Sequence, residues 1–170
     1  ALNNYMRYSN EVSYACSLLF RDFKQLNDQF YLVATDSIDT AVFDKKTVLT
    51  NKNLFPVLPR DLYSITLQDN RYLPYQKRGT PLQLIGKINN VLQEISTTRN
   101  NLENYIITNT YKSDKHLEQG FAWLRRIEVL YYDIFTLQEK LHWNLHALLG
   151  GYYLDSSTAI KLIERLQQVL

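Results

Sequence analysis

The chain has 170 residues, a formal net charge of +2 and one cysteine, which suits a single domain with a proper core and excludes an intrachain disulfide. Five Gly and four Pro are few for this length and favour a mostly helical protein over a turn-rich β fold. The dispersed basic residues give no support for nucleic-acid binding, and no stretch approaches the roughly 18 uninterrupted apolar residues of a membrane span.

The first predicted element is a helix of about thirty residues. It weakens at Thr35-Asp36-Ser37. Cys16 lies on its apolar face, which favours a small buried hydrophobe over a reactive nucleophile. The residues of this face recur every three or four positions: Tyr5, Tyr8, Val12, Cys16, Leu19, Phe23, Leu26, Phe30 and Val33.

Residues 36–79 form a long excursion between the first and second helices. A structureless loop of this length is uncommon in a compact domain. Residues 41–43 and 47–49 flank a charged turn and could form a small hairpin. Residues 59–63, which begin with a proline, could start a short helix.

A second long helix is predicted to begin at Thr80-Pro81, a capping residue followed by proline at the first helical position. Its apolar positions alternate spacings of four and three, as in a heptad seam. They are Leu84, Ile88, Val91, Ile95, Thr98, Leu102 and Tyr105.

A third long helix is predicted from Ser113 or Asp114 to a stop at Gly150-Gly151. Trp123 lies near the centre of its apolar face and is predicted to be core. A short fourth helix is predicted to start at Asp155 or Ser156 and run to Leu170. The face of the third helix comprises Leu117, Phe121, Leu124, Ile127, Tyr131, Ile134, Leu141, Leu145 and Leu148.

The short connections between the second, third and fourth helices predict antiparallel neighbours. We therefore expect one all-α domain over residues 1–170. It would be an elongated up-and-down bundle of three long helices and a short fourth, with the 36–79 excursion packed on its side or end.

Two of the three histidines lie on the third helix, and the spacing of Glu139, His142 and His146 puts all three side chains on one strip. Such a strip could offer ligands to a metal ion, which takes about four. However, Trp143 stands where a zincin has glutamate, there is no second Glu-x-x-His unit, and the strip points away from the core. We favour a polar flank near a helix end, where His suits the helix dipole.

A second apolar surface is predicted on the outer side of the same helix, opposite its core face. Tyr132, Phe135 and Trp143 lie there, whereas Arg125 and Glu128 make the same column charged further up. Exposed aromatic columns are normally covered. The 36–79 excursion or the fourth helix is the simplest cover; a partner protein, or an apolar ligand held against Tyr132, Trp143 and His146, is the alternative.

No sequence pattern supports catalysis. Nucleophile-elbow, phosphate-loop and dinucleotide motifs are absent, and the acidic residues are interspersed with Lys and Arg along faces predicted to be solvated. We expect no catalytic residues and no cofactor.

The segments LNNYMRYSNE (2–11), NLFP (53–56) and NNLENYI (100–106) resemble a family of uncharacterised helical proteins of the Bacteroidota that are thought to be exported to the cell envelope. The resemblance implies an extracytoplasmic location and a natural chain that continues beyond Leu170. Together with the bundle, it suggests a non-enzymatic scaffold or protein-interaction domain with a protein or cell-wall partner. The alternative is a small-ligand or metal-binding sensor bundle that uses Glu139, His142 and His146.

Overall fold

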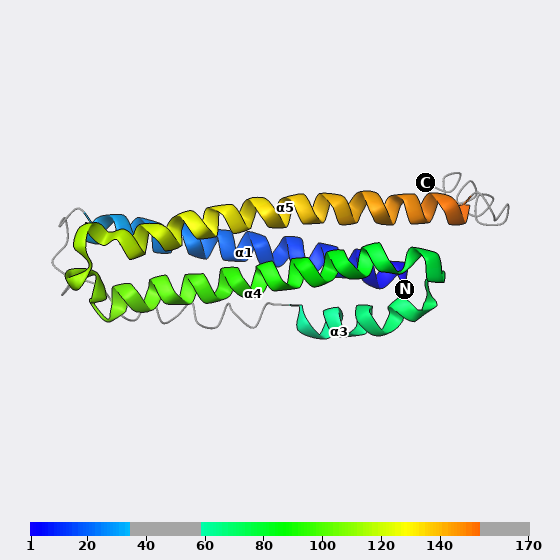
Figure 1. The fold of residues 1–170 in the computed structure, drawn as a ribbon, viewed down its shortest axis with the longest axis horizontal. Helices are drawn as coiled ribbons and strands as arrows, with labels where there is room; N and C mark the ends of the chain where they lie inside the picture. The colour runs from blue at the N-terminus through cyan, green and yellow to red at the C-terminus, as the bar shows by residue number, and fades with distance from the viewer. Residues whose placement is uncertain (35–58, 154–170) are drawn as a thin grey trace, which may run out of the picture.

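The computed structural model describes residues 1–34 and 59–153, and every regular element in these ranges is helical. The α-helices are α1 (Leu2–Ala34), α3 (Arg60–Asp69), α4 (Gly79–Ile107) and α5 (Glu118–Tyr153). Three are long and one is short, and they form the elongated bundle of Figure 1, so the predicted fold class is confirmed. The predicted hairpin over 41–49 and the predicted helix over 155–170 lie outside the described residues.

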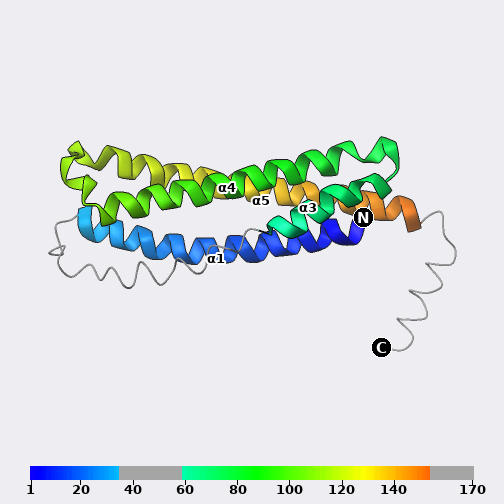
Figure 2. The same ribbon diagram turned by 90° about the horizontal axis from the view of Figure 1, so that it is seen from below.

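Helices α4 and α5 form an antiparallel hairpin, as predicted. Helices α1 and α4 run the same way, and α5 runs against both (Figures 1 and 2). The short α3 begins directly after Pro59, as its sequence suggests, and packs against α1 and α4. The Thr66 hydroxyl is buried against the Asn4 carbonyl at 3.3 Å, and the Tyr5 hydroxyl donates to Asn70 Oδ1 at 2.8 Å.

Both predicted ends of the third helix are wrong by a few residues. Two 3₁₀ turns occupy residues 110–117, and His116 and Leu117 have left-handed backbone angles, so α5 begins only at Glu118. Asp114 nevertheless accepts a hydrogen bond from the backbone N–H of Gln119 at 2.9 Å. At the other end, α5 continues through Gly150 to Tyr153, because a glycine inside a helix costs only about 1 kcal/mol.

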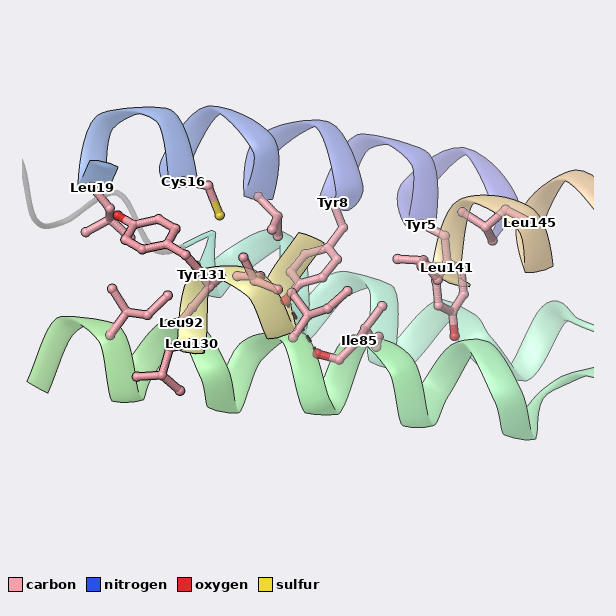
Figure 3. Close-up of a cluster of buried hydrophobic side chains, with 14 of the residues drawn as sticks. Tyr5, Tyr8, Cys16, Leu19, Ile85, Leu92, Leu130, Tyr131, Leu141 and Leu145 are labelled. Atoms are coloured by element: carbon pink, nitrogen blue, oxygen red, sulfur yellow. Dashed lines mark hydrogen bonds between the residues drawn. The ribbon is translucent and has the colours of Figure 1, made fainter. Parts of the chain in front are cut away.

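The core consists of two apolar clusters arranged along the bundle. The larger lies towards the N-terminus of α1 and contains aliphatic layers from α1, α4 and α5, part of which Figure 3 shows. There the Tyr8 hydroxyl points to the Ile85 carbonyl at 3.5 Å. The smaller cluster lies near the α4–α5 hairpin and comprises Leu26, Phe30, Leu102, Tyr105, Ile106, Tyr111 and Leu124.

The predicted apolar face of α1 is buried from Tyr5 to Phe30, except for the half-buried Phe23. The predicted seam of α4 is less accurate: Ile85 and Leu92 are fully buried, whereas Leu84 and Val91 are half-buried. Helix α4 packs against α1, α3 and α5, so a single narrow seam cannot describe it. Trp123 is half-buried at the edge of the smaller cluster rather than in the core.

A charged layer separates the two clusters. Arg99 of α4 donates from Nε to Asp22 Oδ2 of α1 at 2.7 Å and from Nη1 to Glu103 one turn later. All three side chains are 3–4 % exposed. This triad corrects the expectation that the acidic residues lie along solvated faces.

No helix of the described residues is long and apolar enough to cross a membrane.

Candidate interaction surface

The predicted aromatic column on α5 lies on the surface of the bundle. Tyr132 is 74 % exposed, and Phe135 and Trp143 are each 63 % exposed. A helix advances about 100° per residue, so these side chains point away from Ile134 and Leu141, which anchor α5 in the core. We call this surface the outer face of α5; it comprises Arg125, Glu128, Val129, Tyr132, Phe135, Thr136, Glu139, Trp143 and His146.

The described part of the 36–79 excursion does not cover the outer face. Helix α3 packs on α1 and α4, on the side of the bundle remote from α5 (Figure 1). The other segments predicted as a cover, residues 36–58 and the helix over 155–170, lie outside the described residues. Within the described ranges, the outer face is therefore an uncovered aromatic surface.

Of the two histidines of α5, His146 belongs to this surface and His142 lies beside it. The ring centroids of His142 and His146 lie 6.3 Å apart, and the Trp143 ring lies 5.9 Å from His142 and 6.4 Å from His146. Glu139 is exposed on the same strip. In residues 1–34 and 59–153, no three His, Cys, Asp or Glu side chains come close enough together to hold a metal ion. In these ranges Glu139, His142 and His146 form an exposed polar strip beside the Trp143 ring.

A groove between α1 and α5 was not anticipated from the sequence. Its volume is about 440 Å³, and aromatic pairs stand at both ends: Phe20 packs edge-on against Tyr131 at 5.6 Å, and Tyr31 against Phe121 at 6.2 Å. Phe20 and Tyr31 fall outside the periodic face of α1, which is the only sequence signal for it. The groove is lined by Phe20, Phe23, Asn27, Tyr31, Phe121, Leu124, Arg125, Glu128 and Tyr131.

The groove and the outer face share Arg125 and Glu128, which are exposed as predicted. The outer face adjoins a different helix on each of its two flanks. Glu128 lies on the flank next to α1. The opposite flank adjoins α4, where Arg126 forms an exposed ion pair with Glu94.

The buried groups offer little to acid–base chemistry. Arg99 holds both carboxylates of the triad at 3–4 % exposure, out of reach of a substrate in solution. Burial raises the pKa of the Cys16 thiol to about 12, so its thiolate is scarce at neutral pH, in agreement with a buried hydrophobe. Burial, reinforced by nearby Cys16 and Asp22, also raises the pKa of the Tyr131 hydroxyl.

No protein-family model, curated protein or solved structure matches this chain.

Proposed function

We propose that this chain is a non-enzymatic helical scaffold or interaction domain of a bacterial envelope protein, and that it binds its partner through the outer face of α5. The observation that carries the proposal is the exposure of Tyr132, Phe135 and Trp143 along one side of a single rigid helix. Large aromatic side chains supply much of the energy at protein interfaces. A group of exposed ones on a single face marks an interaction site more often than a chance surface.

The rest of the bundle supports a positioning role for α5. Its inward face is held by Ile127, Ile134 and Leu141, which are fully buried. Gln138 adds a tie to α1, donating to Ser13 Oγ at 2.9 Å and to the Ser9 carbonyl at 3.3 Å. A partner would therefore meet a preformed surface and lose little free energy to ordering it.

Photo-crosslinking in the cells that naturally produce the protein tests this proposal. A photoreactive phenylalanine analogue placed at position 143 should give a discrete covalent adduct in the envelope fraction. The same analogue in place of Gln93, an exposed residue of α4, is the matched control. An adduct yield at position 143 no greater than at position 93 would contradict the proposal.

A second candidate function is small-ligand binding, which the groove between α1 and α5 favours. Its volume of about 440 Å³ lies within the range of small-molecule sites, and its aromatic walls suit a flat apolar ligand. Arg125 at its edge could pair with an anionic group. The site proposed for a small ligand is therefore the groove and no longer the strip of Glu139, His142 and His146.

An anilinonaphthalene sulfonate dye, which combines an apolar ring system with one negative charge, is a suitable probe. It should bind with enhanced fluorescence, and Asn27→Trp, which fills the groove, should abolish the signal. The control His146→Ala leaves the groove lining intact. A signal that is lost in the control and kept in Asn27→Trp would return the ligand site to the strip.

A further inference from the structure

We propose that the partner of the outer face of α5 is the same face of a second copy of this chain, packed antiparallel about a two-fold axis level with Leu137. This inference rests on the proposed interaction function and names its partner. The resulting dimer would be isologous, so each residue of the surface would meet the residue that mirrors it across the axis.

The first argument comes from the position of residues along and around α5. In an antiparallel two-fold pair, two residues meet when their sequence midpoint coincides with the axis and they lie on the same flank. Tyr132 and Trp143 are both within about 20° of the centre of the outer face. Their midpoint lies within one residue of Leu137, so each tyrosine would pack against the tryptophan of the other copy.

The second argument is that acidic and basic side chains on both flanks pair about the same axis. Asp133 and Lys140 lie on the flank next to α4, and Glu128 and His146 lie on the flank next to α1. The midpoint of each of these two pairs also lies within one residue of Leu137. Each acid would therefore meet a base of the second copy, and none of the four forms an ion pair within the described part of its own chain.

A charge at the centre of the outer face selects against a parallel dimer. In a parallel two-fold pair the residues at the centre of the face meet their own copies, so Arg125, which lies opposite the core face of α5, would face Arg125. Like charges placed directly opposite are unfavourable and serve to exclude a wrong arrangement. The antiparallel arrangement keeps the two copies of Arg125 far apart and sets acidic against basic side chains on both flanks.

The third argument is the size of the strip and its composition near the axis. From Arg125 to His146 the strip is about 33 Å long at 1.5 Å per residue, and a helix pair of that length buries on the order of 1,200 Å², enough for a stable interface. Near the axis, the Thr136 hydroxyl already donates to the Tyr132 carbonyl at 3.1 Å, so its hydrogen-bond donor would stay satisfied when the interface forms. Glu139 is the one charge near the centre, and it lowers the expected affinity.

Sedimentation of the full chain tests the association. We expect a dimer of about twice 20.1 kDa at micromolar concentration. Trp143→Ala should weaken it at least tenfold, and Glu139→Leu should tighten it. Gln93→Glu, a charge change on an exposed residue of α4, is the control.

Charge reversal tests the pairing itself. Asp133→Lys should weaken the dimer, and adding Lys140→Asp should restore it, because both copies then carry the reversed pair. Failure of the double variant to recover would contradict the pairing.

Disulfide trapping tests the direction, in a chain that also carries Cys16→Ala. Thr136→Cys lies close to the axis and should cross-link two copies rapidly under mild oxidation. Arg125→Cys lies far from the axis and should not cross-link, although a parallel dimer would bring its two copies together. Rapid cross-linking through position 125 would overturn the antiparallel arrangement.

A monomer at high concentration would overturn the dimer whatever else the outer face binds. An adduct from position 143 that contains a different protein would then leave the interaction function standing and remove only the self-association. A monomer in which Trp143 fluorescence is blue-shifted would show that the face is covered from within the chain, which contradicts both proposals.

Discussion

The two apolar clusters of the bundle are built on different principles. The larger one stacks aliphatic side chains such as Ile88, Leu92 and Ile95 in repeating layers. The smaller one depends on rings: Phe30 meets Phe121 edge-on at 5.2 Å, and Tyr105 meets Trp123 edge-on at 5.4 Å. Aliphatic layers follow from the spacing of residues along each helix, whereas ring packing depends on shapes that fit in few ways.

The charged triad marks the boundary between these two regions. Asp22 lies between Leu19 of the larger cluster and Leu26 of the smaller one, and Arg99 lies between Ile95 and Leu102 in the same way. The triad sets two acidic side chains against one guanidinium, and within the described residues Glu103 Oε1 is buried without a hydrogen-bond partner. Removal of the single guanidinium at this boundary should therefore destabilise the fold.

The largest effect is expected from removing the charge at this boundary. Arg99→Met leaves two buried carboxylates without their cation and should lower the free energy of unfolding by about 3–5 kcal/mol. Chemical denaturation measures the change. The control is Arg126→Met in the exposed pair with Glu94, where both side chains are almost half exposed and the loss should stay below about 1 kcal/mol. Equal losses in the two variants would contradict the assignment.

Next in size is a change that tests the tightness of the ring cluster. A Cβ atom at Gly120 would lie 2.3 Å from Cε2 of Phe30, so Gly120→Ala should destabilise the fold by about 1–3 kcal/mol. Gly150, in the same helix, has nothing within 4 Å of such a Cβ. Gly150→Ala should therefore stabilise the helix by about 0.5–1 kcal/mol. Thermal melting of the two variants should show shifts of opposite sign, and a stabilised Gly120→Ala would refute the close contact.

A smaller, pH-dependent effect is expected at the hairpin that closes the ring cluster. The Tyr105 hydroxyl donates to Asp114 Oδ2 at 2.6 Å, and this hydrogen bond lowers the pKa of Asp114 below its ordinary 3.8. A lowered folded-state pKa adds stability that is complete above the ordinary pKa and disappears as the pH falls through the lowered one. Asp114→Asn should therefore lose less stability than the parent between pH 5 and pH 2. The melting temperature across this range measures it, and parallel curves would contradict the contribution.

The smallest effect is one of reactivity within the larger cluster, with no change in stability. Because burial raises the pKa of Cys16 to about 12, the native thiol should react with iodoacetamide at neutral pH far more slowly than the unfolded chain. A cysteine in place of the exposed Tyr14, in a Cys16→Ala chain, is the matched control and should react rapidly. Equal rates for Cys16 and the control would show that this end of the core opens readily.

The sequence predicts most of the bundle because helical periodicity alone determines the buried face of a helix that packs on one side. Helix α1 is such a case, and its face is buried from Tyr5 to Phe30. Helix α4 has three neighbours, so its buried surface is wider than the predicted seam and includes Ile85 and Leu92. The start of α5 could not be predicted, because left-handed backbone angles at His116 and Leu117 are rare for such residues and leave no mark in the sequence.

The exposed aromatic column was predicted by placing residues on a helical wheel, since Tyr132 and Trp143 fall opposite the core. The groove was not, because it depends on the separation of α1 from α5 rather than on either helix alone. The charged triad did leave a signal: Asp22 and Arg99 continue the core spacing of their helices. A charge at a core position indicates burial only when its partner on another helix is known.

The same triad also determines the register of α1 against α4. If α1 moved along α4 by one turn, about 5.4 Å, the guanidinium of Arg99 would face Leu19 or Leu26, and the carboxylate of Asp22 would lose its cation. Aliphatic layers alone would tolerate such sliding, since one leucine level resembles the next. The triad thus fixes the register of α1 against α4 at the level where the two apolar clusters meet.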